Sequence, residues 1–277
     1  MGFVNGGGYR PPVEYLFVDG GALNAEVNQV LKRWWPGQEA DLDYAKIGAG
    51  FGKCFYYDAW PHQREGQDDD AYKLVCDLHD DLIDRISSNG GWHAYAGEAR
   101  HRKRRGLEQK MVDVMIAVDM LRHTFNGNME RCTLLTSDLD FKPLLDALIQ
   151  EGMTVNLWHG AFAPRDLKRA ADNLRPLNVA GVHALMTTDW IAAHPLPGCG
   201  SGPLDRGGHE PVEVGPKPDG RDWVLYRKLG TDELMLTWDD LTNKGYSMQV
   251  TTPDKDVMAK YVEDLYGWKP WDYPDRA

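Results

Sequence analysis

The sequence lacks the features of membrane-spanning, secreted and zinc-stabilised proteins. None of its apolar runs approaches the roughly 18 residues that a membrane span needs. Its first eight residues lack the charged and apolar regions of a signal peptide. Its four cysteines are scattered, with no Cys-x-x-Cys pair and no histidine partner at zinc spacing. We therefore expect a soluble cytoplasmic protein with reduced thiols and no membrane partner.

Two common phosphate-binding motifs are also absent. Segment 48–53 reads Gly-Ala-Gly-Phe-Gly-Lys, but Ile47 stands where a P-loop needs glycine and Cys54 where it needs serine or threonine. Lys53 occupies the last glycine position of the dinucleotide-binding fingerprint. The sequence thus argues against a P-loop enzyme and against a dinucleotide-binding site.

Positive charge is scarce over the chain as a whole. With 31 Lys and Arg against 42 Asp and Glu, the formal net charge of −11 argues against a protein that coats nucleic acid by bulk charge. One local segment differs, because five basic residues lie close together there: Arg100, Arg102, Lys103, Arg104 and Arg105. We expect this segment to bind RNA phosphates, with an ordinary solvated charge run as the alternative.

What the sequence does contain is an alternation of short apolar strands and amphipathic helices. We expect strands at 13–18, 54–60, 92–95, 132–137 and 154–158. We expect helices from about 24 to 35, at 71–87, around 112–121 and at 141–151, and a helical turn at 164–172. Strands that alternate with helices at this spacing predict an α/β fold, in which helices cover both faces of a parallel sheet.

Composition divides the chain into four parts. Residues 1–12 are rich in Gly and Pro and are expected to form a flexible arm before the main α/β domain, residues 13–193. Residues 194–222 have the composition of a Gly/Pro-rich linker. Residues 223–277 predict a small C-terminal α+β appendage with a helix at 255–266, through which a homo-oligomer or a protein partner could form.

Acidic side chains follow two of the expected strands. Asp19 ends the first strand, and Asp138 and Asp140 follow the strand at 132–137. In open parallel sheets the ligand site lies outside the carboxyl ends of the strands. Carboxylates that converge there supply the hard oxygen ligands of Mg²⁺ or Mn²⁺. Asp113, near the start of a helix, is expected to reach the same edge from the side.

Each of these acids has a simpler alternative role. An Asp that follows a strand often caps the next helix, and Asp140 lies just before one. Asp119 lies about 120° round the helix from Asp113, at 100° per residue, so both cannot point at one metal ion. We expect Asp119 in a supporting position behind the metal ligands or in a core hydrogen bond. Lys110 would orient a carboxylate or contact the scissile phosphate, with an ordinary first-turn lysine as the alternative.

Several motifs together resemble one known family. They are Phe-Val-Asp19-Gly-Gly, Lys110-x-Val-Asp113, Leu-Thr-Ser137-Asp138-x-Asp140-Phe, Gly152-x-x-Val and Leu167-x-x-Ala-Ala-Asp172. In this order, over roughly residues 13 to 190, the chain resembles the NYN family, the PIN-like ribonuclease domains that include the LabA-like group. One position departs from the pattern, because many relatives carry Asn where this chain has Ala22.

The resemblance implies a three-layer α/β/α sandwich with a central parallel sheet. It implies an acidic pocket that holds Mg²⁺ or Mn²⁺ and hydrolyses RNA phosphodiesters, and Asp19, Asp113, Asp138 and Asp140 match its acidic positions. We therefore predict a metal-dependent endoribonuclease, in which Ser137 supports the carboxylates. The alternative is a regulator that binds RNA or a nucleotide in the same pocket without cleavage. A Toprim-like nuclease and a phosphatase related to haloacid dehalogenases are minor alternatives. The chain resembles Toprim nucleases in a strand-end acid followed later by Asp-x-Asp, but those begin with Glu; it resembles the phosphatases in Asp-x-Asp, but Lys142 stands where they carry Thr or Val.

Overall fold

The computed structural model describes residues 11–97, 105–205 and 207–271, and within 105–110 it describes the backbone without the side chains. The arm predicted for residues 1–12 lies outside the described residues except for its last two. The chain forms two compact units. Unit 1 contains residues 1–177 and 181–187, and unit 2 contains residues 178–180 and 188–277.

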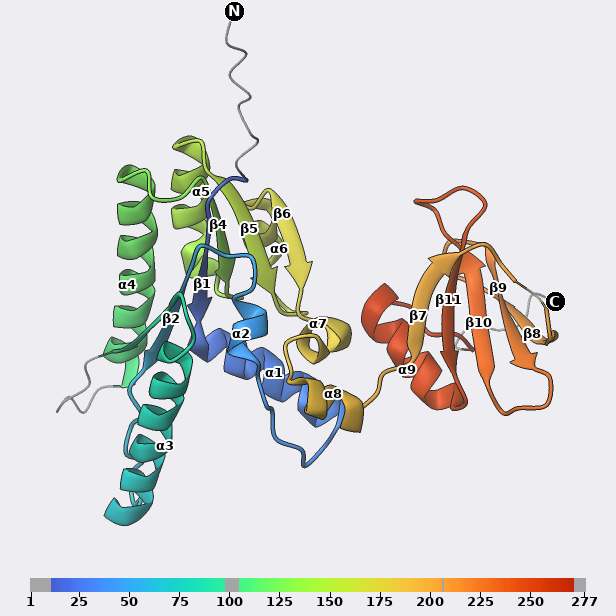
Figure 1. Ribbon diagram of the computed structural model, residues 1–277, viewed down its shortest axis with the longest axis horizontal. Coiled ribbons are helices and arrows are strands. Elements are labelled where there is room, and N and C mark those ends of the chain that lie inside the picture. Colours follow the sequence, from blue (N-terminus) through green and yellow to red (C-terminus); the bar gives the residue numbers. More distant parts are fainter. Residues whose placement is uncertain (1–10, 98–104, 206, 272–277) are drawn as a thin grey trace, which may run out of the picture. The chain divides into compact units, whose positions relative to one another are not determined.

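A six-stranded parallel sheet forms the centre of unit 1 (Figure 1). Its strands are β1 (Glu14–Asp19), β2 (Lys53–Ala59), β3 (Trp92–Gly97), β4 (Arg131–Leu135), β5 (Thr154–His159) and β6 (Asn173–Pro176). They lie in the order β3-β2-β1-β4-β5-β6, so the direction in which the chain adds strands reverses between β1 and β4. Ligands of open α/β sheets bind outside the carboxyl ends of the strands at such a reversal.

Helices connect the strands of unit 1. They are α1 (Gly20–Trp34), α2 (Tyr44–Ile47), α3 (Asp69–Ser87), α4 (Arg105–Phe125), the 3-10 turn η1 (Leu139–Phe141), α5 (Lys142–Gln150) and α6 (Arg165–Arg169). Two short helices follow β6, namely α7 (Val179–His183) and α8 (Thr188–Ala193). No helix within the described ranges combines the length and the apolar character needed to cross a membrane.

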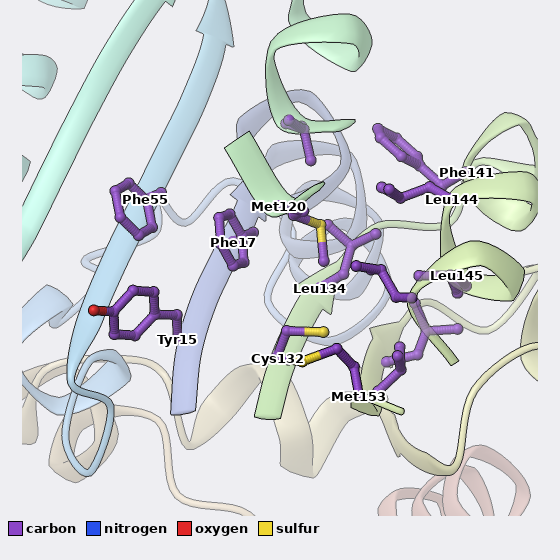
Figure 2. Packing of buried hydrophobic residues seen from close by; sticks show 14 of the residues in the cluster. Tyr15, Phe17, Phe55, Met120, Cys132, Leu134, Phe141, Leu144, Leu145 and Met153 are labelled. Carbon is purple, nitrogen blue, oxygen red and sulfur yellow. The ribbon is translucent and has the colours of Figure 1, made fainter. Parts of the chain in front are cut away.

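The main core of unit 1 lies between the sheet and helices α4 and α5. Phe17 from β1 and Leu134 from β4 are fully buried there against Met120 from α4 (Figure 2). Leu145 from α5 is also fully buried in this cluster. Helix α1 packs on the opposite face and buries Leu23, among others. Apolar side chains thus cover both faces of the central strands, as expected for a parallel sheet.

The architecture confirms the predicted fold class, a PIN-like α/β/α sandwich with a C-terminal α+β part. One boundary prediction was wrong, because helix α1 begins at Gly20 and not near Asn24. The reason is that the Asp19 carboxylate accepts a hydrogen bond from the Ala22 N–H and so caps the helix directly after β1. Strand β6 was not predicted from the sequence.

Unit 2 is a five-stranded antiparallel sheet with one long helix. Its strands are β7 (Gly198–Gly202), β8 (His209–Pro216), β9 (Asp222–Lys228), β10 (Leu234–Asp239) and β11 (Ser247–Thr252), in the order β7-β11-β10-β9-β8. Helix α9 (Lys255–Tyr266) packs against β11. The prediction of a linker at 194–222 was wrong, since β7 and β8 lie within it. Residues 188–193, predicted to belong to the first domain, group with this unit.

Candidate active site

Asp19 lies at the carboxyl end of β1, beside the point where the strand order reverses. One carboxylate oxygen accepts the capping hydrogen bond from the Ala22 N–H at 3.1 Å. The other accepts a hydrogen bond from the Thr136 hydroxyl at 3.0 Å. Two bonds from neighbouring elements therefore fix this carboxylate in one orientation. Asp19 therefore caps the helix and still lies at the predicted edge of the sheet, so capping does not exclude the predicted role at the site.

Thr136 connects Asp19 to the acids that follow β4. Its buried hydroxyl donates to Asp19 and also accepts the backbone N–H of Asp138 at 3.2 Å. The Asp138 carboxylate caps the turn η1 by accepting the Asp140 N–H at 2.9 Å. Asp138, and not Asp140, is therefore the capping residue of η1, and Asp140 is exposed. Sequence reasoning gave Thr136 no role, although it directly precedes the candidate residues Ser137 and Asp138.

The pKa values of Asp19 and Asp113 respond to the charges of other predicted acids, so these carboxylates interact electrostatically. Burial, the largest cause, and the charges of Asp19, Asp138 and Asp140 together raise the pKa of Asp113 to about 6. Burial is also the largest cause of the raised pKa of Asp19, to which the charges of Asp58 and Asp138 contribute. Repulsion between close carboxylates favours the protonated form. A bound cation would relieve this repulsion.

The Ser137 hydroxyl connects three parts of unit 1 through hydrogen bonds. Its hydroxyl donates to the carboxylate of Glu26 on α1 at 2.8 Å and accepts the N–H of Gly160, directly after β5, at 2.9 Å. A Cβ at Gly160 would lie 1.8 Å from the Glu26 carboxylate, so only glycine allows this approach. Sequence reasoning predicted that Ser137 supports the carboxylates but missed Glu26 and Gly160.

Asp58 is a further acid at this edge that sequence reasoning missed. It lies at the end of β2 with its side chain only 15% exposed, and its charge raises the pKa of Asp19. Its carboxylate accepts the N–H of Ala59 at 2.8 Å and the hydroxyl of Tyr56 at 3.3 Å. The same argument that singled out Asp19, an acid at the end of an apolar strand, applies to Asp58.

Asp119 points toward the core of unit 1. Its carboxylate accepts a hydrogen bond from the hydroxyl of the fully buried Tyr57 at 2.9 Å. Its charge raises the pKa of Tyr57 together with burial, which is the larger cause. It is not among the charges that raise the pKa of Asp113. Of the two roles that the sequence left open, this contact favours the core hydrogen bond.

The predicted RNA-binding segment falls largely outside the described residues. Four of its members, Arg100, Arg102, Lys103 and Arg104, lie in the undescribed range 98–104. Arg105 begins α4, and Lys110 lies on the same helix, but the side chains of both belong to the undescribed part. Their predicted roles stay predictions.

The acids fit a divalent cation in donor type and in charge. Within residues 11–97, 105–205 and 207–271, no three His, Cys, Asp or Glu side chains are grouped tightly enough to form a ready-made metal cage. Mg²⁺ does not require one, because it usually keeps several waters and binds proteins through one or two carboxylates plus substrate phosphates. Burial is the largest cause of the raised pKa of Asp19 and Asp113, repulsion from neighbouring carboxylates adds to it, and such an ion would offset that repulsion. The arrangement therefore suits a hydrated cation.

Comparison with known proteins adds a family match. Residues 54–178 match the model of the NYN domain family. No curated protein matches the chain. Among solved structures, a protein of unknown function from Vibrio parahaemolyticus is similar to this chain at 13% sequence identity and a TM-score of 0.44. The match covers 65% of this chain and 99% of that one.

Proposed function

The chain carries a domain of the NYN family, and from this premise we propose that it is a metal-dependent endoribonuclease. The observation that carries the proposal is the Thr136 hydroxyl, which hydrogen-bonds with both the Asp19 carboxylate and the Asp138 N–H and so holds the two acids near each other. The raised pKa of Asp19 and Asp113, caused first by burial and then by neighbouring charges that include Asp138, agrees with this arrangement. These acids gather where the strand order reverses between β1 and β4. A crowded acidic edge at that point suits a cation that bridges the protein and a phosphodiester.

Asp19 and Asp138 would hold the cation, Mg²⁺ or Mn²⁺, with Asp113 and the exposed Asp140 completing the acidic edge. When bound, such an ion polarises a phosphate oxygen and lowers the pKa of a coordinated water. The protein's own contribution is orientation. Thr136 holds Asp19 and the backbone of Asp138 through one hydroxyl, so the two carboxylates keep a fixed relation while substrate binds.

The proposed substrate is RNA, and the supporting observation is in the sequence. The basic segment 100–105 lies a few residues before Asp113, so it would guide phosphates toward the acidic edge of an otherwise acidic protein. A cytoplasmic location, and a homo-oligomer or protein partner bound through unit 2, belong to the same proposal.

The test is cleavage of single-stranded and structured RNA by the purified chain in Mg²⁺ or Mn²⁺. Wild type should cut, and Asp138→Asn should not, because the amide keeps the shape but loses the charge that binds a cation. Asp146→Asn is the matched control, since Asp146 lies on α5 and pairs with Lys142 outside the acidic edge. Cleavage that survives in Asp138→Asn at the wild-type rate would refute the proposed site.

The second candidate is an RNA- or nucleotide-binding regulator that uses the same pocket without cleavage. The basic segment 100–105 is compatible with this function, because contacts with phosphates would support RNA binding whether or not cleavage follows. The same assay separates the two functions. Specific RNA binding without cleavage by wild type in either metal would establish the regulator and exclude the nuclease.

A further inference from the structure

A row of polar side chains crosses the face of the sheet opposite α4 and α5. The carboxylate of Glu14 on β1 accepts hydrogen bonds from Thr133 on β4 and from the amide of Asn156 on β5, each at 2.6 Å. The amide of Asn173 on β6 donates to Asn156 at 2.9 Å. These residues alternate along their strands with core residues such as Tyr15, so they point away from the main core. Apolar side chains usually fill such positions in a parallel sheet.

The polar row lines a pocket of about 280 Å³. Its other walls include Phe51, Trp158 and Arg175. Pockets for drug-sized ligands span roughly 300 to 1,000 Å³, so this one suits a single small ring. It lies away from the acidic edge, because Thr133 precedes Thr136 by three residues of extended chain, about 10 Å along the strand direction.

Arg175 gives the pocket a flat, charged wall. Its guanidinium lies 4.1 Å from the ring centroid of Trp158, which Phe51 contacts in turn edge to face. Among the residues that the structure describes, none forms an ion pair or a hydrogen bond with this guanidinium. Partial burial lowers the pKa of Arg175, which indicates a group that has lost water without gaining a charged partner. Its five N–H donors and its outer face are therefore available to a ligand.

Unused hydrogen-bonding groups define the ligand's chemistry. Only one oxygen of Glu14 accepts bonds from described residues, so its second oxygen is available as an acceptor. The exposed Asn173 uses one amide N–H within the row, which leaves a donor and an acceptor. A planar ring with adjacent donors and acceptors matches this set, and bases stack on aromatic rings and on guanidinium planes.

We propose that this pocket binds a nucleobase, which stacks on the Arg175–Trp158 pair and hydrogen-bonds with Glu14 and Asn173. The base belongs either to a free nucleotide or to an unpaired residue of RNA. The two sources share one recognition chemistry and differ only in what the ribose phosphate is attached to. The proposal does not depend on cleavage, because the pocket contains none of the acids at the proposed active site.

Binding of AMP, GMP, CMP, UMP and a single-stranded RNA heptamer tests the proposal. The Asp138→Asn chain prevents cleavage during titration, and saturation-transfer NMR reports contact with the base protons. Stacking contributes about 1 to 3 kcal/mol per base, so Arg175→Ala should weaken binding roughly 5- to 150-fold. Arg175→Lys should also weaken it, since lysine keeps the charge but loses the plane. Arg169→Ala, which removes an equal charge from the exposed surface of α6, should not.

The outcomes separate the two sources of the base and allow the proposal to fail. Binding of mononucleotides that depends on Arg175 supports a free nucleotide, and binding of the heptamer alone supports an RNA base. Photocrosslinking of a 5-bromouridine heptamer should label the peptide that contains Trp158. The proposal is overturned if no ligand binds, or if Arg175→Lys, which preserves the charge and the aliphatic stem, binds as wild type does. Binding is measured in the Asp138→Asn chain, so the result does not depend on whether the wild-type chain cleaves RNA.

Discussion

Replacing Ser137 with Ala should weaken unit 1 measurably, because one hydroxyl serves two partners. The buried N–H of Gly160 would lose its acceptor, which costs about 1 to 3 kcal/mol for an unsatisfied buried donor. The half-buried Glu26 carboxylate would lose one donor but could recruit water, so its loss lies near about 0.5 to 1 kcal/mol. Together these losses predict destabilisation by about 1.5 to 4 kcal/mol.

Hydrogen exchange of the β4 amides measures this loss in unit 1 alone, which matters because the chain has two units. Ser88→Ala is the matched control. The Ser88 hydroxyl donates to the backbone oxygen of Arg85 at an exposed helix end, so its removal should stay within about 0.5 kcal/mol. Equal opening free energies in Ser137→Ala and Ser88→Ala would refute the reasoning. In a double-mutant cycle, Ser137→Ala combined with Glu26→Gln should show coupling of about 0.5 kcal/mol or more.

Three further predictions concern the acids and their partners. Because the pKa of Asp113 is raised from 3.8 to about 6, its contribution to stability is fully present below about pH 4 and is lost as the pH rises through 6. Stabilisation by Mn²⁺, read as the shift in melting temperature, should therefore grow above pH 6 and shrink at pH 5, and a shift independent of pH would contradict this. Thr136→Val removes a hydrogen bond that lowers the pKa of Asp19, so NMR titration should find that pKa higher than in wild type. An unchanged pKa would show that the bond is unimportant. Tyr57→Phe removes the buried hydroxyl that donates to Asp119, so it should destabilise unit 1 by about 1 to 3 kcal/mol. The affinity for Mn²⁺ should not change. Weakened Mn²⁺ binding would instead place Asp119 at the metal.

The strand-end acids could be predicted from the sequence because their position follows from local pattern. An apolar run that ends in Asp places the carboxylate at the edge of a parallel sheet, and this located Asp19 and Asp138. Glu26 and Gly160 could not be found in this way. Their contacts with Ser137 join residues that are 111 and 23 positions apart, respectively, and only the folded sheet brings them together.

The Gly and Pro content of residues 194–222 led to the wrong prediction of a linker, and the position of β7 and β8 in the sheet explains why. Strands β7 and β8 form the two edges of the antiparallel sheet of unit 2. Edge strands tolerate proline, because one side of the strand needs no hydrogen-bond donor. Pro211 and Pro216 therefore fit within β8. Central strands β9 and β10, which are bonded on both sides, contain neither proline nor glycine.

Anomalous scattering from crystals soaked in Mn²⁺ shows whether the acidic edge binds a cation. We expect a peak at the carboxyl ends of β1 and β4, bonded to carboxylate oxygens of Asp19, Asp138 or both. The peak should vanish in Asp138→Asn crystals soaked at the same concentration and persist in Asp146→Asn crystals. No peak at this edge at saturating Mn²⁺, or a peak unchanged by Asp138→Asn, would show that these carboxylates do not bind the cation.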